Sequence, residues 1–414
     1  MSGDEKIRMA HGSGGLDSAE LMERVFKPRF GNETLARLED SAVVDTGSGR
    51  IAVSTDSFVV TPLVFPGGDI GKLAATGTIN DVLMSGATPK YLTCGFVIEA
   101  GLSISLLDSI CASLANVADE AGVSIIAGDT KVIEGRGESG GLIINTTGVG
   151  VFEEAAVIEG RGEGGGLIIN TTGAGVFEEA AVIEGCGESG GLIINTTGAG
   201  VFEETAPECV PNTDCEKSAP QRPTADGIRP GDVIIVSGNL GDHHAAILSA
   251  RMGIKNDIES DCALLAPITE ALRTGGVNIH SMRDVTRGGL ATVLNELAIA
   301  SGVDLLLEES RLPVNPAVKA FCGIMGLDPL YMGNEGKVVM AVAPEDAKRA
   351  LACIRGTLIG KNAAIIGEAL FSADADADAK AMAPQGRIPL SMRTRLGGNV
   401  RLDVLYGEGL PRIC

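Results

Sequence analysis

Acidic side chains recur near the ends of the β-rich segments in the first third of the chain. Taken one at a time, each is more typical of a turn or a helix cap. Together they predict a cluster of oxygen ligands, which is what Mg²⁺ bound to a nucleotide requires. The set consists of Glu39, Asp40, Asp56, Asn80, Asp81 and Asp129, of which Asp40, Asp56, Asp81 and Asp129 are the expected metal ligands.

Asp129 and Lys131 belong to a Gly-Asp-Thr-Lys run that follows a short apolar segment, residues 123–127. If that segment is a buried strand, the carboxylate and the ammonium emerge at its end. Ligands of α/β folds usually bind at such strand ends. We therefore expect both side chains at the site.

Two glycine-rich segments could bind anions. His11, Gly12, Ser13, Gly14 and Gly15 precede a helical pattern, and their backbone N–H groups could cradle phosphates. The alternative is a disordered N-terminal arm. The run from Asp284 to Leu290, DVTRGGL, opens a helix, where an Asp is usually only a cap. The Arg and the two glycines beside it also make an anion site plausible.

Cys414 is the last residue of the sequence. A terminal thiol can be carried into a pocket on a tether, and the segment from Gly407 onward spans roughly 25 Å when extended. An inert last residue is the alternative, and composition alone favours it.

The elements that must position these side chains alternate along the chain. Apolar alternation predicts a strand over residues 50–60, and apolar runs predict further strands. Helical patterns lie between them. The predicted order is strand 50–60, helix 70–84, strand 91–99, helix 102–121 and strand 123–127, followed after residue 231 by a second α/β block with strand 232–238 and helices over 243–253 and 288–302.

A repeat interrupts this alternation. Val132–Ala156 recurs almost unchanged as Val157–Ala181 and as Val182–Ala206, a period of 25 residues. Three copies could form a short β-solenoid. Near-identity over so few copies instead favours tandem duplication of one glycine-rich hairpin inside a normal domain. Each copy also contains G-x-G-x-x-G, but a strand-like run follows it where a dinucleotide site needs a helix.

Composition excludes several classes of protein. Asp and Glu number 54 against 33 Lys and Arg, a net charge of −21 that repels phosphate backbones, so we expect no nucleic-acid partner. No apolar run is long enough for a membrane span, and the N-terminus lacks the apolar core of a signal peptide. The nine cysteines include no Cys-x-x-Cys pair. We therefore expect no zinc site. We expect a reducing, cytoplasmic location.

The motifs taken together resemble a known family. HGSGG, STDSFVV, FPGGDIGKLAATGTINDV, GDTK, GDHH, RDVTRGGL, YMGNEGK and a terminal PRIC occur in this order. They are similar to HypE, the hydrogenase maturation factors of the AIR synthetase (PurM-like) superfamily. The resemblance covers nearly the whole chain except two repeat copies and a lengthened linker.

The resemblance implies a mixed α+β and α/β fold with two PurM-like domains: a dimerising N-terminal sheet domain and a C-terminal α/β domain with a flexible tail. We expect an ATP-binding domain over residues 1–206 with the repeats at 132–206, a linker over 207–230, the second domain over 231–386 and the tail over 387–414.

The resemblance also implies an activity. A HypF-type carbamoyltransferase would place a carbamoyl group on Cys414, and ATP-dependent dehydration would convert it to a thiocyanate. The cyanide would pass to the iron of a [NiFe]-hydrogenase on a HypC–HypD scaffold. Lys131 and Glu335 would lie beside the thiocarboxamide. His11, Gly12, Ser13, Gly14, Gly15, Asn80 and Asp284 would contact nucleotide, with Mg²⁺ on the four aspartates.

Two other functions stay open: a small-molecule kinase or amidine-forming ligase of the same superfamily, and a non-catalytic scaffold disabled by the extra repeats. The terminal cysteine argues against the first. The intact GDTK and NEGK motifs argue against the second.

Overall fold

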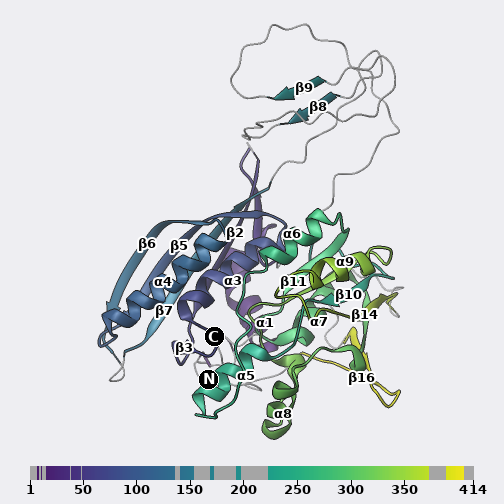
Figure 1. The fold of residues 1–414 in the computed structure, drawn as a ribbon. Coiled ribbons are helices and arrows are strands. Elements are labelled where there is room, and N and C mark those ends of the chain that lie inside the picture. The colour runs from purple at the N-terminus through teal and green to yellow at the C-terminus, as the bar shows by residue number, and fades with distance from the viewer. Residues whose placement is uncertain are drawn as a thin grey trace, which may run out of the picture. The chain divides into compact units, whose positions relative to one another are not determined.

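The computed structural model describes residues 7–8, 11, 15–37, 39–47, 49–135, 140–152, 222–372 and 388–404, and the backbone of 168–171 and 193–196. The chain divides into two compact units, one formed by residues 1–151 with 222–414 and the other by residues 152–221. The candidate site lies in the first unit, drawn in Figure 1.

A five-stranded sheet forms the N-terminal half of the first unit, in the order β1-β2-β7-β5-β6. Neighbouring strands are antiparallel, except that β5 and β6 are parallel. The bounds are β1 Ala42–Asp45, β2 Arg50–Phe58, β5 Thr88–Glu99, β6 Ser124–Ile133 and β7 Leu142–Val151, with a small pair β3 Val64–Phe65 and β4 Gly68–Asp69 beside it.

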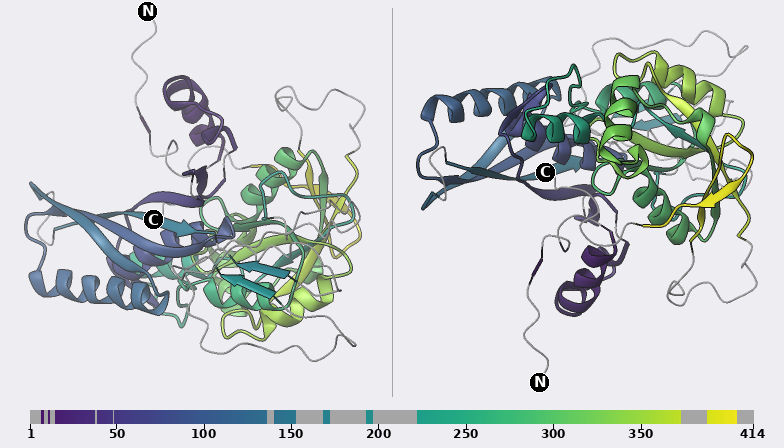
Figure 2. Two further views of the ribbon diagram at one scale, coloured as in Figure 1. Left: turned by 90° about the horizontal axis from the view of Figure 1, so that it is seen from above. Right: turned by 90° about the horizontal axis from the view of Figure 1, so that it is seen from below.

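The two faces of this sheet differ. Even-numbered positions of β7 are buried, whereas odd-numbered positions are exposed or partly exposed, as period-2 side chains require. Helices α3 (Ile70–Met84) and α4 (Ile104–Glu120) cover the face to which the even positions point (Figures 1 and 2). We call the opposite face of this sheet the open face.

Helix α3 begins at Asp69, whose side chain accepts hydrogen bonds from the backbone N–H groups of Gly71 and Lys72 at 2.8 and 2.9 Å, as a good N-cap does. Its glycines allow close packing. A Cβ on Gly71 would lie 2.1 Å from the carbonyl oxygen of Ile110 in α4. A Cβ on Gly77 would lie 2.8 Å from the ring of Phe58 in β2. Almost every residue of α3 is therefore buried.

A seven-stranded sheet forms the C-terminal half, in the order β11-β13-β10-β14-β12-β15-β16. The bounds are β10 Val233–Val236, α5 Asp242–Arg251, α6 Ala266–Thr274, β11 Ile279–Asp284, α7 Gly289–Ser301, β12 Asp304–Glu308, α8 Pro316–Met325, β13 Val338–Val342, α9 Ala347–Arg355, β14 Ala364–Leu370, β15 Leu390–Arg393 and β16 Asn399–Arg401, with 3₁₀ turns at Glu309–Arg311 and Pro329–Tyr331.

The N-terminal helical segment has no buried residue in the described chain. It consists of α1 Leu16–Leu21, a π-helical turn Met22–Phe26 and α2 Lys27–Phe30, followed by a 3₁₀ turn Leu35–Arg37. It lies on the other side of the first sheet from α4 (Figure 2). Phe26 and Phe30 stack on each other with ring centroids 6.2 Å apart, and both are exposed.

Two expectations about the glycine-rich region are wrong. The predicted strand 123–127 is longer, because β6 continues to Ile133 and contains the GDTK run, and it is exposed along its whole length. Asp129 and Lys131 therefore lie within an edge strand and do not follow a buried one. The predicted hairpin is absent as well, because β5 lies between β6 and β7 in the sheet.

The first repeat copy supplies β7, which pairs with β2 on one side and β5 on the other. In the second unit, β8 (Ile168–Thr171) and β9 (Ile193–Thr196) come from the next two copies. They pair in parallel with equivalent residues opposite each other, such as Ile168 with Ile193. The surplus copies thus pair with each other.

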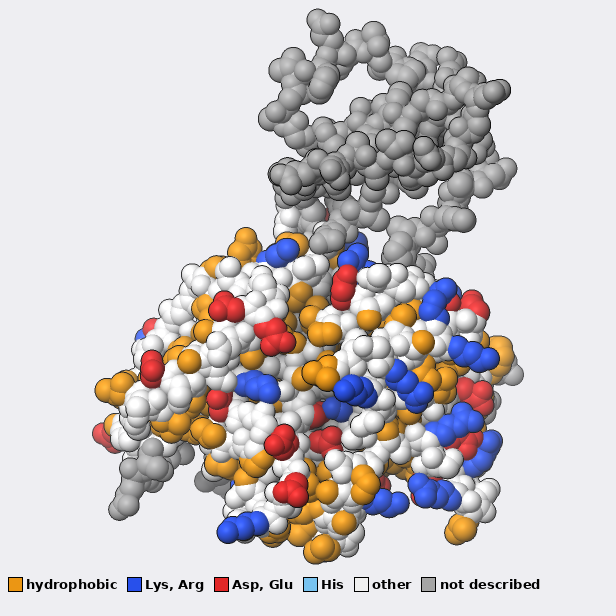
Figure 3. Space-filling view, in the orientation of Figure 1, with side chains coloured by type: hydrophobic (Ala, Val, Ile, Leu, Met, Phe, Trp, Pro, Cys, Tyr) orange, Lys and Arg blue, Asp and Glu red, His pale blue; other side chains and the backbone are white. Residues whose placement is uncertain are grey.

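In the part of the chain that the structure describes, no helix is both long and apolar enough to cross a bilayer. On the face shown in Figure 3, acidic side chains lie among the basic ones, and no continuous basic surface forms there.

Candidate functional site

Five buried or part-buried acidic side chains influence one another where the two halves of the first unit meet; we call them the carboxylate cluster. Asp40 precedes β1, Asp56 lies in β2, Asp81 in α3 and Asp284 at the end of β11, and Glu335 precedes β13. Burial raises the pKa of Asp81 well above its ordinary value, and the charges of Asp284, Asp56 and Asp40 add to this. The five groups share one low-dielectric environment.

Hydrogen bonds hold Asp81 at the centre of the carboxylate cluster. Ser54 donates through Oγ to Asp81 Oδ2 at 2.7 Å, and Ser41 donates through Oγ to the Asp81 carbonyl oxygen at 2.6 Å. Burial is also the main cause that raises the pKa of Asp56.

Arginines lie beside the carboxylate cluster. Arg283 donates from Nε to Asp40 Oδ1 at 2.7 Å and pairs through Nη1 with Glu296 Oε2 at 3.1 Å. Burial raises the pKa of Asp40, and the Arg283 charge opposes that rise. The charge of Arg287 similarly opposes the raised pKa of Glu335 and of Asp56. The charges of Arg283 and Arg287 thus offset only part of the effects that raise the pKa values of these carboxyl groups.

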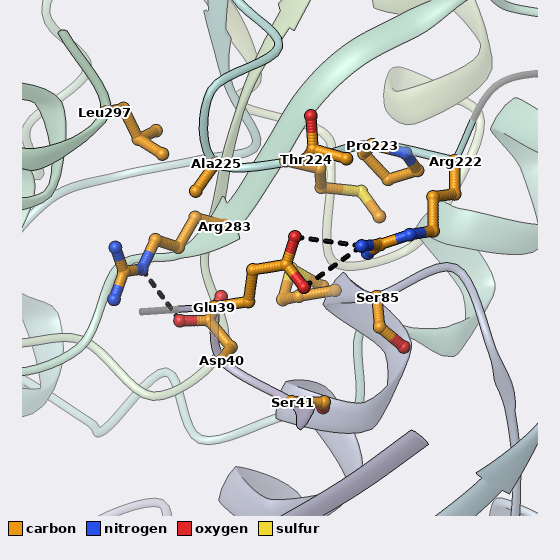
Figure 4. A pocket seen from close by; sticks show the side chains of 12 residues that line it. Glu39, Asp40, Ser41, Ser85, Arg222, Pro223, Thr224, Ala225, Arg283 and Leu297 are labelled. Carbon is orange, nitrogen blue, oxygen red and sulfur yellow. Dashed lines mark hydrogen bonds and ion pairs between the residues drawn. The ribbon is translucent and has the colours of Figure 1, made fainter. Parts of the chain in front are cut away.

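A small pocket lies next to Asp40 and is shown in Figure 4. Arg283 and Arg222 lie at opposite sides of it, each paired with an acidic side chain of the segment that enters β1. Met84, Met282, Leu297 and Pro223 supply apolar lining. The pocket therefore borders the carboxylate cluster where the chain re-enters the first unit at Arg222.

The cluster fits a divalent cation by its chemistry. Its donors are carboxylate and hydroxyl oxygens, the set that Mg²⁺ prefers. Burial and the neighbouring carboxylates disfavour the charged forms of Asp81 and Asp284, and a bound cation would favour them. No three Asp, Glu, His or Cys side chains of the described residues already converge as metal ligands. The donor set fits, and the side chains would have to turn toward a bound ion.

Asn80 is part of the interior. Its Nδ2 donates to the carbonyl oxygens of Ala263 and Glu335 at 3.1 and 3.5 Å, and its Oδ1 accepts from the N–H of Leu265 at 2.8 Å. It is 1% exposed. Asn80 therefore braces α3 against the C-terminal half of the unit, a role that the expected nucleotide contact did not anticipate.

Glu335 lies in the irregular segment before β13 and is 6% exposed. Burial raises its pKa well above the ordinary value, and the negative charges of Asp284 and Asp261 raise it further. A carboxyl group of raised pKa can accept a proton at near-neutral pH more readily than an ordinary one. Glu335 is therefore a buried carboxyl group whose charged form is disfavoured.

Asp129 and Lys131 do not join the carboxylate cluster within one chain. Their side chains are 70% and 69% exposed and pair with each other at 2.8 Å. Register places Asp129 beside Gly95, then Asn145 and Ser57, on the open face of the sheet. Asp56 faces the helices instead, and three strand spacings, about 14 Å in all, separate β6 from β2.

The phosphate-cradle segment is described only at its ends. His11 accepts through Nδ1 from the N–H of Arg8 at 3.0 Å, and Gly15 precedes α1 with φ of 80°. Gly12, Ser13, Gly14 and Cys414 lie outside the described residues.

Sequence reasoning missed Asp261, Lys337 and Arg283. Lys337 belongs to the NEGK motif, in which the sequence pointed to the glutamate alone. Asp261 stands in a loop without periodicity, so no sequence pattern indicated it.

Models of two AIR synthase related protein domains match this chain, the N-terminal domain over residues 38–152 and the C-terminal domain over residues 229–375. The surplus repeats fall between the two matches. The expected fold class of two PurM-like domains is thereby confirmed.

Named relatives match over almost the full length. The carbamoyl dehydratase HypE of Rhodobacter capsulatus is 39% identical over 417 aligned residues, covering 99% of each chain. A crystal structure of a HypE–HypF complex matches with a TM-score of 0.69 at 35% identity, covering 93% of this chain and 99% of that one. A crystal structure of HypE in complex with ATP matches with a TM-score of 0.66 at 37% identity, covering 98% of each.

The two domain matches, the shared motifs and the identity along the full length agree with one another. The chain belongs to the HypE family of carbamoyl dehydratases.

Proposed function

We propose that this chain uses ATP to dehydrate a carbamoyl group carried on its own Cys414, forming a thiocyanate that supplies cyanide for [NiFe]-hydrogenase maturation. The observation that carries the proposal is the buried Glu335 beside the carboxylate cluster, in a chain of this family. Two of the similar structures support it, since one is a HypE in complex with ATP and the other is a complex of HypE with HypF.

The chemistry explains why both a phosphate site and a base are needed. The amide oxygen is a poor leaving group, so it attacks the γ-phosphorus of ATP, an O–P bond forms and ADP leaves. The C–O bond to phosphate then breaks, the N–H protons are lost and a C≡N bond forms. The net loss from the carbamoyl group is one water. Glu335 is the group that we assign to accept an N–H proton.

We assign Asp40, Asp56 and Asp81, with Asp284 beside them, as the residues that would hold Mg²⁺. When bound, the ion would neutralise charge on the transferring phosphoryl group. The charges of Asp56 and Asp40 help to raise the pKa of Asp81, so a bound cation would favour its charged form. The segment from His11 to Gly15 would cover the phosphates.

We propose further that the chain acts as a homodimer in which Asp129 and Lys131 come from the second copy. The exposed edge strand β6, the open face of the sheet and the unburied N-terminal helix favour such pairing. An exposed strand edge is a ready template for another chain. This arrangement would let Lys131 and Asp129 serve a site that they cannot reach within their own chain.

The partners that we propose are a HypF-type carbamoyltransferase, which would load Cys414, and a HypC–HypD complex, which would accept the cyanide. The first proposal is supported by the similarity of this chain to a HypE that was crystallised with HypF.

Intact-mass measurement tests the activity. After incubation with the carbamoyltransferase, carbamoyl phosphate and ATP, the chain should gain one carbamoyl group and then lose one water. Cys414→Ala should show neither change while still binding ATP. An adduct that forms on Cys414 and never loses water would refute the dehydratase function.

A further inference from the structure

The segment that carries Glu335 has no regular secondary structure, yet it is buried. Asn334, Glu335 and Lys337 are 0%, 6% and 7% exposed. Asn334 accepts through Oδ1 from the N–H of Gly241 at 2.7 Å and donates through Nδ2 to the carbonyl oxygen of Met332 at 3.1 Å. A base on irregular chain holds its position only if other groups fix the backbone, because no helix or sheet ladder does so.

Asp261 is the side chain that fixes this backbone. Its Oδ1 accepts from the N–H of Glu335 at 3.1 Å, and its Oδ2 accepts from the N–H of Gly336 at 3.4 Å. Lys337 Nζ donates to Asp261 Oδ2 at 2.8 Å, in an ion pair whose side chains are 8% and 5% exposed. One carboxylate therefore binds three consecutive residues of the NEGK motif.

Gly336 allows this close approach. A Cβ at that position would lie 2.0 Å from the carbonyl oxygen of Asp261 and 3.0 Å from the backbone nitrogen of Ala263. No other residue fits without moving the backbone. The glycine of NEGK is thus explained by its contact with residues 261–263.

Residues 260–265 are themselves anchored from three sides. Ser260 donates its N–H to the carbonyl oxygen of Pro66 at 2.8 Å, and its Oγ is 2.7 Å from His243 Nδ1. Asn80 holds Ala263 and Leu265 from α3 through its side-chain amide. Asp261 consequently stands on a rigid support that reaches into both halves of the unit.

We propose that Asp261, charge-balanced by Lys337, is a positioning residue that holds Glu335 in place for proton transfer. The role rests on the proposed function, because it assumes that Glu335 is the base. Asp261 lies behind the backbone of Glu335 and acts through it. It is not a group that touches substrate.

The test must separate positioning from loss of folding. Asp261→Asn alone leaves the Lys337 ammonium buried without its partner, which can unfold the chain. The paired variant Asp261→Asn with Lys337→Met removes both charges and keeps similar volumes. Asp232→Asn is the matched control, because Asp232 is also buried at 2%, pairs with His280 and accepts a backbone N–H from Arg229.

The measurement is single-turnover water loss from carbamoylated Cys414, followed by mass, together with the KM for ATP. We expect the paired variant to be slower by about 100-fold with an unchanged KM for ATP, since displacement of a catalytic group by about 1 Å has an effect of that size. The control should stay within about threefold of the unaltered protein. In a Glu335→Gln background, the paired change should have no further effect, because residues that act as one unit are not additive.

Four outcomes would overturn the proposal. An unchanged rate in a folded paired variant would overturn the positioning role alone. A loss that multiplies with that of Glu335→Gln would show that Asp261 acts independently of Glu335. Full activity of Glu335→Gln, or no water loss by the unaltered chain, would overturn the assigned base or the proposed function, and this role with it.

Discussion

Arg222 donates from Nη2 to both carboxylate oxygens of Glu39, at 3.0 and 3.2 Å. Arg222 is the first described residue after the unit that holds the surplus repeats, and Glu39 is the neighbour of Asp40 in the carboxylate cluster. This pair therefore fastens the returning chain beside the candidate site.

Arg222→Gln should lower stability, because it leaves Glu39 largely buried without its cation. The side chains of the pair are 18% and 13% exposed, so we expect a loss of about 1–3 kcal/mol in a denaturant titration. Arg273→Gln is the control, because its pair with Glu270 is 70% and 59% exposed and should contribute under about 0.5 kcal/mol. Equal losses in both variants would contradict the anchoring role.

Asp81→Asn should stabilise the chain in the absence of divalent cations at pH 8. The pKa of Asp81 is raised in the folded state, so its contribution to stability is fully present below the unfolded pKa and is lost as pH rises. Replacing the carboxyl group by an amide removes this loss of stability at high pH. The gain in thermal midpoint should shrink as the pH falls toward 4, where the carboxyl is protonated.

Mg²⁺ with nucleotide should raise the thermal midpoint of the unaltered chain. The Asp81→Asn variant should show no such rise. Equal midpoints for Asp81→Asn and the unaltered chain at pH 8 would count against a repulsive carboxylate cluster.

Mixed dimers test whether Lys131 serves the partner's site. Lys131→Ala and Glu335→Gln should each reduce dehydration to a small residual rate when they are the only chain present. Mixing the two after subunit exchange should restore about a quarter of the activity, because half of the dimers are mixed and one of their two sites is intact. If mixing restores nothing although exchange is shown by mass, Lys131 acts elsewhere or not at all.

Removal of residues 157–206 should leave a folded chain. The deletion keeps the copy that supplies β7, and surface insertions of this length cost only loop-closure entropy, about 0.6 kcal/mol per doubling. The thermal midpoint should be unchanged, and light scattering on heating should fall because strands with free edges are removed.

Removal of residues 132–181 is the matched control for that deletion. It leaves the third copy directly after Lys131, and that copy should form β7 as well because its sequence is nearly the same. Unfolding of both variants would show that the repeats are an integral part of the structure.

His243 should make the chain sensitive to acid. Burial lowers its pKa to about 4 from 6.5, so its contribution to stability is complete above pH 6.5 and is lost as pH falls toward 4, at most about 3 kcal/mol. Asp242 acts in the opposite sense, because its pKa is raised to about 6. His243→Asn should flatten the fall in thermal midpoint between pH 6.5 and 4. An equally steep fall would contradict this assignment.

The regular elements were accessible from sequence where an apolar pattern marks them. Helix α3 has the bounds predicted from its apolar and small residues, Ile70–Met84, and β2 nearly so. The predicted strand ended at residue 127, six residues before the end of β6, because an edge strand exposed on both faces has no burial pattern in its sequence. Apolar periodicity reflects burial, and no residue of β6 is buried.

The site was accessible only in part for a related reason. Asp40, Asp56, Asp81, Asp284 and Glu335 stand in recognisable motifs, and the structure brings them together. The face of the sheet to which Asp129 points depends on strand order and register, which a linear motif does not contain. Asp261 acts through backbone N–H groups 74 and 75 positions away, and a single Asp in a loop gives no sign of such contacts.

The central place of β7 sets an order of events during synthesis. Strands β2 and β5 emerge from the ribosome first, and each lacks its β7 neighbour until residues 142–151 follow. Three almost identical segments then emerge in succession, and the first of them is the one that forms β7. Because domains fold as their N-terminal parts appear, at about 5–20 residues per second, the first copy has a lead of one to a few seconds over the second. The copy that lies in the middle of the sheet is therefore also the first copy to be synthesised.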